Sequence, residues 1–524
     1  MKYGLLLMAF CCFLAKDVAC LLALLIWASA TVHAQDPAYY PVIKPIIQKH
    51  CIGCHQPGNV GAMPLTTYEE VSVYGKMIQY VTSIQLMPPW YADPTYRHFS
   101  NENILSDEDI RKINDWVNGN LPEGVDTTTM HLSDKKELSP VRQPDLVIPM
   151  DKAFEQTGIF LDQYQVFVLP THLKEDKWID GIQFVPGNKK IVRYASISIE
   201  SSNKFDDYDS WDLRPGYYSF GGLGKTPDQS CWFTWSPQQE TIFYPPGSAK
   251  FLRRGSKLIL HIHYGPTGQS QSDSSFVQLF FASKKVDSPI LTAPFINPYS
   301  LNEDSFFIAA KSIKNFHASY TVPYDIRVLS LTPQANLICR SWQVYAMLPG
   351  ESNAVNLLKI KEWNYNWKQT YRFESPIYLP KGTVIQTFAH YNNTVNNPHN
   401  PSDPPDPVRW GAHSLGELFF VHFEFISSSF SNSSFQFIAP VIVSDNILSV
   451  EMNVEKQGEY KFEICNAEGL NCKVAKTNSL TSGRYSIDVP VVDIPEGNYL
   501  LRIADELHNV SAEQLFIKMR ENGL

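Results

Sequence analysis

The sequence predicts a multidomain protein in which a small all-α domain is followed by all-β domains built as antiparallel sandwiches. Three observations predict this fold class. The chain has 524 residues, too many for one hydrophobic core, because single cores stop growing beyond about 250–300 residues. Short runs of alternating apolar and polar residues dominate after residue 150 and are typical of half-buried strands. Pro (36) outnumbers Gly (27), which fits sandwiches with proline-rich connections.

Residues 1–34 are predicted to be an export signal and not part of the fold. Two apolar runs lead to Val32-His33-Ala34, and small or apolar residues at the −3 and −1 positions indicate cleavage after Ala34. The alternative is an uncleaved membrane anchor, because Lys16 and Asp17 split an unusually long signal. We expect an exported protein, in the periplasm or at the cell surface or outside the cell, whose mature chain has no stable membrane span.

Residues 35–124 are predicted to form the small helical domain. A helix is expected over 41–49, and the segment from Thr66 to Glu70 contains a capping box that starts a second helix toward Tyr80. A third helix begins after Ser106. Its apolar residues recur at helical spacing and lie on one face: Ile110, Ile113, Trp116 and Val117.

The helical domain carries the pattern Cys51-Ile52-Gly53-Cys54-His55. Two thiols at this spacing add across the vinyl groups of a porphyrin, and the histidine that follows is placed to ligate the iron. A redox dithiol would require a thioredoxin-like unit around it, and a zinc site would require a second ligand pair nearby; neither pattern is present. We therefore expect one covalently bound haem c, held by Cys51 and Cys54.

The second axial ligand of the haem iron is predicted to be Met87, in Met87-Pro88-Pro89-Trp90. A thioether opposite His55 raises the reduction potential and leaves no open position on the iron for oxygen. Met63, in Ala62-Met63-Pro64-Leu65, is the competing sulfur. The expected iron ligands are thus His55 and Met87.

Five further segments follow the helical domain. Polar and proline-marked linkers separate regions of alternating apolar and polar residues. In the last region, Cys465 and Cys472 flank a predicted hairpin turn, and a disulfide between them would indicate an oxidising compartment. The predicted segments are a linker over 125–150, a first sandwich over 151–290, a second over 291–430, a linker over 431–445 and a small C-terminal sandwich over 446–524.

The charge balance weighs against a protein that binds nucleic acid. The net charge is −9 and the isoelectric point is about 5.9, whereas nucleic-acid binding needs a basic face. The expected partner is a redox protein or a small electron donor or acceptor.

The two central sandwiches resemble the copper type II, ascorbate-dependent monooxygenases, the group of peptidylglycine and dopamine hydroxylases, and most closely the bacterial members that carry a cytochrome c domain in front. The resemblance covers most of residues 40–425. It implies an oxidoreductase with one copper in each sandwich. The stretches that carry it include Leu65-Thr66-Thr67-Tyr68, Met87-Pro88-Pro89-Trp90, Tyr244-Pro245-Pro246-Gly247, His263-Tyr264-Gly265-Pro266-Thr267-Gly268, Leu331-Thr332-Pro333, Asn366-Trp367-Lys368-Gln369-Thr370-Tyr371, Leu379-Pro380-Lys381-Gly382 and Val408-Arg409-Trp410-Gly411.

The ligand positions that the resemblance implies are mostly substituted in this chain. The family holds its first copper with a His-His pair and a later His; here the pair is Arg193-Tyr194 and only His263 remains. The family holds its second copper with His-x-His and a Met. These positions are Gln334, Asn336 and Leu418. A guanidinium cannot ligate, amide oxygens are poor copper ligands and leucine offers none, so copper is not expected.

His261 and His263 lie two residues apart on one predicted strand and so face the same way. Two imidazoles could meet one ion there, but two ligands rarely hold a metal alone. His390, His413 and His422 fit no recognised site and are interpreted as surface or core histidines. The C-terminal tail, around Ile494-Pro495-Glu496-Gly497 and Leu500-Leu501-Arg502-Ile503, resembles the sorting domains of type IX secretion; an ordinary accessory sandwich is the alternative.

Three hypotheses for the function follow. The first is a haem c electron-transfer protein of the cell envelope, on a copper monooxygenase-like scaffold without its coppers. The second is a monooxygenase that hydroxylates an organic substrate, with the haem feeding electrons to a remodelled metal site. The third is a secreted binding protein with a structural haem. The missing copper ligands weigh against the second hypothesis. The resemblance in fold does not offset this, because fold alone does not fix function.

Overall fold

The structure is a computed structural model in which helices and strands are assigned over most of the chain after residue 36. The predicted signal over 1–34 and His413 lie outside the described residues. The described residues are 37–519 without 127–141, 159, 225–230, 238, 412–414, 428–434, 440, 445, 468 and 506–509.

Contacts divide the chain into two compact units. The helical unit contains the chain up to Cys51, Leu65–Met87 and Leu105–Lys136. The larger unit contains Ile52–Pro64, Pro88–Ile104 and the chain from Glu137 onward, and it holds all the sheets.

The helical unit is built as the capping signals predict, with one break. Thr67 and Glu70 form the expected capping box, and Ser106 accepts a hydrogen bond from the backbone N–H of Asp109. The helix expected to run toward Tyr80 is instead two helices that meet at Tyr74. The elements are a π-helical turn (Tyr39–Ile43), α2 (Lys44–His50), α3 (Tyr68–Val73), α4 (Gly75–Ser83) and α5 (Asp107–Asn118).

Aromatic side chains form the centre of the helical unit. Trp116 is fully buried, and its indole N–H donates to the carbonyl of Pro122 at 3.0 Å. Tyr39 packs against Trp116 and Tyr68, with ring centroids 6.0 and 5.4 Å apart. These contacts fix the first helical turn against α5.

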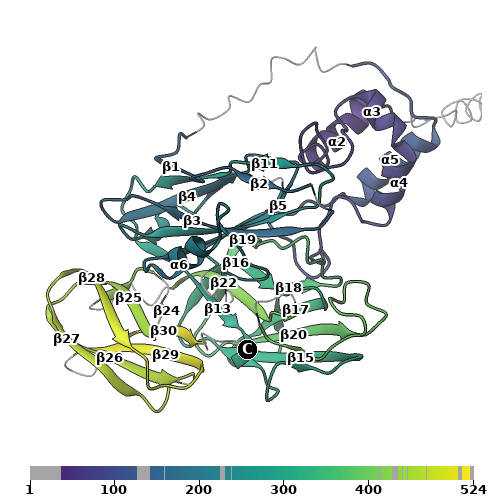
Figure 1. The fold of residues 1–524 in the computed structure, drawn as a ribbon. Coiled ribbons are helices and arrows are strands. Elements are labelled where there is room, and N and C mark those ends of the chain that lie inside the picture. The colour runs from purple at the N-terminus through teal and green to yellow at the C-terminus, as the bar shows by residue number, and fades with distance from the viewer. Residues whose placement is uncertain are drawn as a thin grey trace, which may run out of the picture. The chain divides into compact units, whose positions relative to one another are not determined.

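The first sandwich consists of two antiparallel sheets that enclose an aliphatic and aromatic core (Figure 1). One sheet has the order β6-β3-β10-β5-β7 and the other contains β1-β12-β4-β9. Their strands are β1 (Leu146–Pro149), β3 (Gln163–Pro170), β4 (Lys177–Val185), β5 (Val192–Glu200), β6 (Tyr217–Tyr218), β7 (Phe233–Trp235), β9 (Ser248–Leu252), β10 (Lys257–Tyr264) and β12 (Phe276–Phe281). A short helix, α6 (Lys204–Trp211), follows β5.

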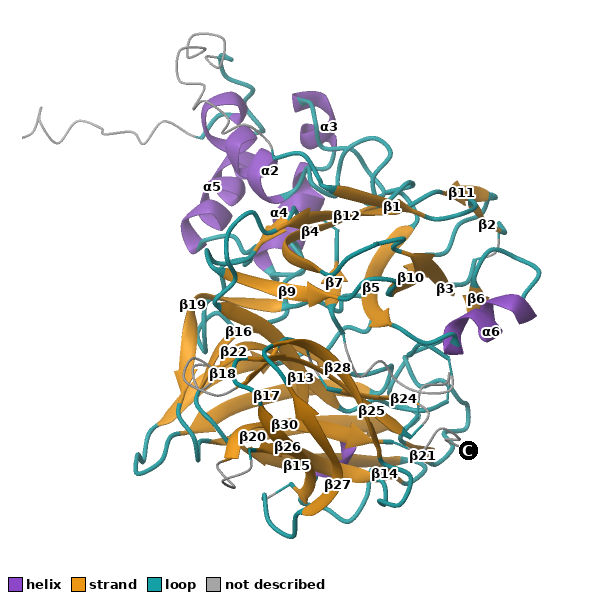
Figure 2. Ribbon diagram, turned by 90° about the vertical axis from the view of Figure 1, so that its left-hand side faces the viewer, coloured by secondary structure: helices purple, strands orange, loops and turns teal. Residues whose placement is uncertain are grey.

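The second sandwich continues a sheet of the first, because β13 pairs in parallel with β9 and antiparallel with β22. Its sheets are β13-β22-β16-β19 and β15-β20-β17-β18 (Figure 2). The all-β sandwich prediction for both central regions is therefore confirmed at the level of the sheets. The strands are β13 (Ser288–Ile296), β15 (Ser312–Thr321), β16 (Ile326–Gln334), β17 (Cys339–Met347), β18 (Ala354–Ile360), β19 (Tyr371–Leu379), β20 (Val384–Asn393) and β22 (Phe420–Ser427).

The C-terminal region forms a third, smaller pair of sheets. The predicted hairpin is present, between β26 (Gly458–Asn466) and β27 (Lys473–Leu480), and Cys465 and Cys472 are joined by a disulfide. The other strands are β23 (Phe435–Phe437), β24 (Ile442–Ser444), β25 (Ile447–Val454), β28 (Gly483–Pro490), β29 (Gly497–Ala504) and β30 (Val510–Lys518).

The predicted linkers contain strands at their downstream ends. Within 431–445, β23 and β24 both pair with β25, and Phe435 and Phe437 are fully buried. Within 125–150, β1 pairs with β12 and buries Ile148. In both places a short alternating run is enough to add a strand to an adjacent sheet, which composition alone does not reveal.

Residues 88–104, expected within the helical domain, pack instead against the second sandwich. Trp90 and Phe99 both contact the ring of Tyr371, with centroids 5.4 and 5.3 Å apart. The backbone N–H of Asp93 donates to the carbonyl of Lys359 at 2.8 Å. These aromatic side chains belong to the core of the second sandwich.

A buried ion pair lies where the two sandwiches meet. Lys250 of β9 contacts the carboxylate of Glu424 on β22 at 2.6 Å, and both side chains are largely buried. We expect Lys250→Met to destabilise the protein by about 3 kcal/mol, because it removes the ammonium partner of a buried carboxylate and leaves Arg372 and Ser330 to stabilise it. Lys285→Met, at an exposed pair with Asp287, is the matched control and is expected to change stability by less than about 0.5 kcal/mol.

The free energies of unfolding of both variants, measured in urea, check this prediction. An equal loss in the two variants would contradict it. The double variant Lys250→Met/Glu424→Leu is not expected to recover the loss, because Arg372 is then buried without the carboxylate of Glu424.

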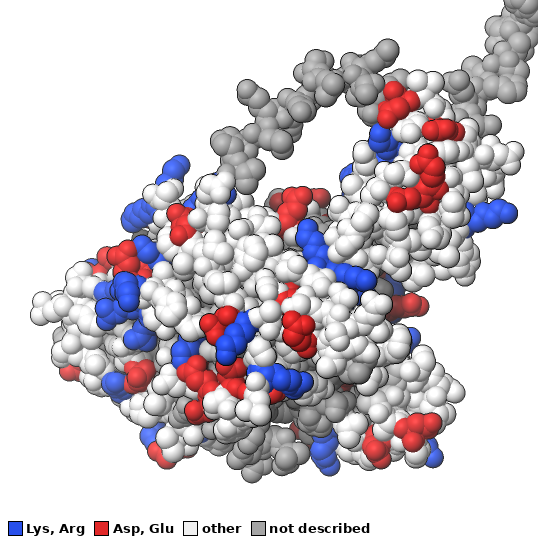
Figure 3. Space-filling view, turned by 45° about the horizontal axis from the view of Figure 1, so that its top comes forward, with Lys and Arg blue, Asp and Glu red and all other residues white. Residues whose placement is uncertain are grey.

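On the face shown in Figure 3, acidic and basic side chains are interspersed in small groups. No helix among the described residues combines the length and apolar character that crossing a lipid bilayer requires.

Candidate functional site

The loop that follows α2 holds His55 in a defined orientation. The ring Nδ1 of His55 lies 3.0 Å from the backbone carbonyl of Met63. Since a carbonyl only accepts, Nδ1 carries the proton in the neutral ring and the lone pair is on Nε2. This is the arrangement that a metal-ligating histidine needs, because the second nitrogen fixes the tautomer and the ring orientation. Met63, the competing sulfur, contributes its backbone to this loop.

Gly61 is required by the packing of His55. The backbone N–H of Gly61 donates to the carbonyl of Cys54 at 2.9 Å. A Cβ on Gly61 would lie 2.6 Å from Nδ1 of His55 and 2.8 Å from the carbonyl oxygen of Cys54. The absence of a side chain at this position therefore leaves the room that the imidazole occupies.

We expect Gly61→Ala to displace the imidazole and to weaken the hydrogen bond between His55 and Met63. Loss of a hydrogen bond that orients a metal ligand typically costs about 10- to 100-fold in metal affinity or activity. Gly58→Ala is the matched control, because Gly58 has φ +83° but no atom within 4 Å of the added Cβ. The fraction of chains that carry haem after expression, measured from the optical spectrum, compares the two; equal fractions would contradict the prediction.

An apolar stripe is uncovered on the helical unit. Apolar side chains at helical spacing along α3, α4 and the turn after α4 are 38–78% exposed: Val73, Met77, Tyr80, Ile84 and Met87. The opposite face of α4 is buried through Ile78 and Thr82. Exposed contiguous apolar surface of this kind marks an interaction site.

The types of these residues are those that covalent haem attachment requires. Cys51 and Cys54 would supply the thiols, and neither is in a disulfide. His55 has an Nε2 lone pair for the iron, and Met87 offers a soft sulfur.

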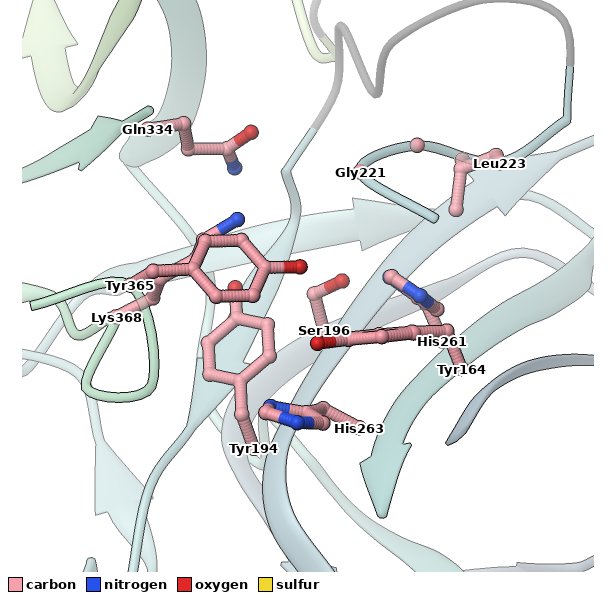
Figure 4. A pocket seen from close by; sticks show the side chains of 11 residues that line it. Tyr164, Tyr194, Ser196, Gly221, Leu223, His261, His263, Gln334, Tyr365 and Lys368 are labelled. Atoms are coloured by element: carbon pink, nitrogen blue, oxygen red, sulfur yellow. The ribbon is translucent and has the colours of Figure 1, made fainter. Parts of the chain in front are cut away.

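The larger unit contains a second site, a pocket lined by both sandwiches (Figure 4). The space open to the centre of a water-sized molecule there is about 20 Å³. The first sandwich contributes Tyr164 from β3, Tyr194 from β5, His261 and His263 from β10; the second contributes Gln334, Tyr365 and Lys368.

Strand alternation explains why the two histidines face the pocket. Leu258, Leu260 and Ile262 of β10 point into the sandwich core, so His261 and His263 point to the other face. His263 lies opposite Tyr194 in the register of β10 and β5. The structure thus brings together two positions that the resemblance assigns to the first copper.

Both histidines are held in their neutral form. Burial lowers the pKa of His261 to about 3, and its Nε2 has no hydrogen-bond partner among the described residues. Burial also lowers the pKa of His263, although Asp162 opposes this effect through a contact of 2.8 Å with Nε2. His263 stacks on Tyr164, with ring centroids 4.5 Å apart. An imidazole whose Nε2 is bonded to a carboxylate and whose face is stacked is firmly oriented.

Arg193 lies next to this pocket and reaches the His55 loop. Its Nη1 donates to the carbonyl of Val60 at 3.3 Å. Burial lowers the pKa of the guanidinium, while Asp162 and Cys54 act in the opposite direction. Arg193, which stands at the first position of the family's His-His pair, therefore links the His55 loop to the first sandwich.

The side chains at the positions assigned to the second copper bond to or pack against different partners. Gln334 lines the pocket and donates to the sulfur of Cys231 at 3.2 Å. Asn336 donates through Nδ2 to the carbonyl of Gly416 at 3.1 Å. Leu418 is not among the pocket residues; it packs with Phe420 and with Ile517 and Met519 of the C-terminal sandwich.

Sequence reasoning missed Tyr164, Tyr365 and Lys368 as pocket residues. Lys368 lies within a stretch that carries the family resemblance, and no local pattern marks the two tyrosines. Of the remaining histidines, His390 contacts Asn315 at 2.6 Å and His422 is buried.

Comparisons with known proteins give no family for this chain. No family model matches, and no curated protein matches. Among solved structures, the chain is similar to a β-D-glucuronidase of Dictyoglomus thermophilum, with 12% identity, TM-score 0.15 and coverage of 45% of this chain and 44% of that one. It thus spans less than half of that enzyme. It is also similar to the BSP domain of a biofilm-associated protein, with 10% identity, TM-score 0.14 and coverage of 72% and 82%. These similarities are too weak to carry an argument.

Proposed function

We propose that this protein is a haem c electron-transfer protein of the cell envelope. The observation that carries the proposal is the His55 loop: it follows the Cys-x-x-Cys pattern directly, and the bond from Nδ1 to the Met63 carbonyl leaves the Nε2 lone pair for iron. A bound haem supplies a one-electron couple between ferric and ferrous iron. The uncovered apolar stripe on α4 supports the same assignment.

The chain's own residues set the properties of this couple. The Met63 carbonyl holds the His55 ring in place, and Gly61 leaves room for that ring. Met87 would offer a thioether to the iron, which would favour the ferrous state and limit access of oxygen. The expected reaction is outer-sphere transfer of single electrons to and from a redox protein or a small donor or acceptor.

We further propose that the sandwiches are a copper monooxygenase-like scaffold without copper. The residues do not fit that metal. Of the positions that line the pocket, Tyr194 and Gln334 stand where the resemblance requires imidazoles, and His263 is the single retained ligand. The Lys368 side chain adds an amine to the same pocket. We therefore do not propose that this chain carries out a monooxygenase reaction through copper.

Export is supported by the disulfide between Cys465 and Cys472, since such bonds persist in oxidising compartments. Covalent haem attachment and disulfide formation are then both expected on the far side of the inner membrane.

Coulometric titration of the mature protein tests this function. One haem and no copper predict the uptake of one electron per chain, at a single potential. Three electrons per chain, with two of them taken up as two copper(II) electron paramagnetic resonance signals disappear, would instead identify a working monooxygenase; reduction of the disulfide also takes two electrons but changes no copper signal. A protein that takes up no electron over the accessible range would fit a binding protein with structural haem.

A further inference from the structure

We propose that the pocket between the two sandwiches binds one small monovalent anion, such as a halide, against the ammonium group of Lys368. This inference does not depend on the proposed electron transfer. It assigns a ligand to the place where the resemblance implies a metal cation.

Lys368 is a partly buried cation at the wall of the pocket, and no described carboxylate contacts it directly. Its Nζ lies 4.2 Å from the centroid of the Tyr365 ring. Among the described residues, it forms no salt bridge and donates no hydrogen bond. A buried charge is costly unless it is paired, and an anion that enters the pocket would provide the missing partner.

The carboxylate that acts electrostatically on Lys368 is already occupied. Glu417 accepts hydrogen bonds from the backbone N–H groups of Asn336, Ile338 and Leu418. Burial raises the pKa of Glu417 to about 7, so it carries only part of a negative charge at neutral pH. Glu417 therefore neutralises the Lys368 ammonium group incompletely.

The other polar groups of the pocket suit an anion better than a metal. The hydroxyls of Tyr365 and Tyr164 are hydrogen-bonded to each other, so one of the two protons is left for another acceptor. His261 and His263 stay neutral, so they add no competing charge. The Lys368 ammonium group, which itself lowers the pKa of both imidazoles, repels a metal cation from them.

The size of the pocket limits the ligand. About 20 Å³ is open to the centre of a water-sized molecule, and one such sphere needs roughly 10–15 Å³ by the same measure. We expect a single halide ion to suit this space better than sulfate or a larger organic anion. Selection by size is therefore expected in addition to selection by charge.

Anion binding is expected to depend on pH through Lys368. Burial lowers the pKa of Lys368 to about 8, and Glu417 and Cys231 oppose the shift. Because only the ammonium form attracts an anion, affinity falls by about tenfold for each pH unit well above the pKa. Ionisation of Glu417 adds a negative charge as pH rises, so it also weakens anion binding at higher pH. The titratable groups that face Lys368 are Tyr365 on the same loop, Tyr164 on β3, Tyr194 on β5, the two histidines on β10, Cys231 before β7 and Glu417 before β22.

The test uses the full mature chain in its haem-loaded, reduced form. Crystals soaked in sodium bromide are expected to show an anomalous peak beside Nζ of Lys368. In solution, the chloride-35 NMR line is expected to broaden, and sodium bromide but not sodium sulfate at equal ionic strength should reverse the broadening. Lys368→Met should remove it, while Lys285→Met, at a lysine that is 89% exposed, should keep it.

Absence of a bromide peak beside Lys368, or equal broadening in Lys368→Met and the unchanged protein, would overturn the proposal. If Lys368→Met does not fold, the pH profile of the unchanged protein decides. A line broadening that decreases as the pH rises from 7 to 9 supports the site, and a line broadening that stays constant across this range refutes it.

Discussion

The variant Cys51→Ser/Cys54→Ser is expected to contain no haem that survives denaturation. A hydroxyl does not add to the vinyl groups of the porphyrin as a thiolate does, so both covalent bonds are lost. Haem staining after a denaturing gel measures the effect, and staining at less than about one hundredth of the unchanged protein is expected. Cys231→Ser is the matched control, because it removes a buried thiol that forms no disulfide and lies outside the motif.

Haem that remains on the double variant after denaturation would show that another residue makes the bond. Each single variant, Cys51→Ser or Cys54→Ser, is expected to keep one covalent bond and part of the staining. Full loss with Cys231→Ser would assign the effect to folding and not to the motif.

Met87→Ala is expected to lower the reduction potential of the haem and to abolish the sulfur-to-iron absorption band. The shift should be on the order of a tenth of a volt or more, within the roughly 0.8 V that axial ligands span. Thioether ligation favours ferrous iron, so its loss stabilises the ferric state. Potentiometric titration followed by optical spectra gives both quantities in one experiment.

Met63→Ala and Met77→Ala are the matched controls for this prediction. Met63 contributes its backbone carbonyl to His55, which alanine retains, and Met77 lies on the exposed stripe of α4. Neither is expected to remove the absorption band. If Met63→Ala removes it and Met87→Ala does not, the assignment of the second axial ligand is wrong.

Local signals in the sequence predicted local structure correctly. The capping box at Thr67 and Glu70 starts α3, Ser106 caps α5, and the hairpin closed by Cys465 and Cys472 is present. Each depends on residues a few positions apart, where hydrogen-bond geometry is nearly independent of the rest of the chain. The alternating patterns after residue 150 likewise predicted strands, because successive side chains of a strand point to opposite faces and produce a two-residue period.

Features that depend on distant contacts were not predictable in this way. The segment from Trp90 to Phe99 follows a helical domain directly in the sequence, yet its aromatic rings pack on Tyr371 in a sandwich. Phe435 and Phe437 lie in a serine-rich stretch, and only their pairing with β25 shows that they belong to a sheet. Composition describes such segments as linkers because the partner strand lies elsewhere in the sequence.

The pocket also combines residues that local patterns predict with residues that only distant contacts bring in. Register places His263 opposite Tyr194 as strand reasoning allows, but Tyr365 and Lys368 arrive from a loop of the other sandwich. Leu418, matched by motif to a copper-ligating methionine, packs on the C-terminal sandwich. A match of motifs locates a position along the chain, while the direction of its side chain depends on packing that the motif does not encode.

The central claim is that the haem is the only redox centre retained on this scaffold. Elemental analysis of the mature, haem-loaded protein, with an optical spectrum of the same sample, tests it most directly. We expect about one iron per chain, a low-spin haem c spectrum and copper near zero even after incubation with copper and dialysis. Two coppers per chain that survive dialysis would contradict the claim.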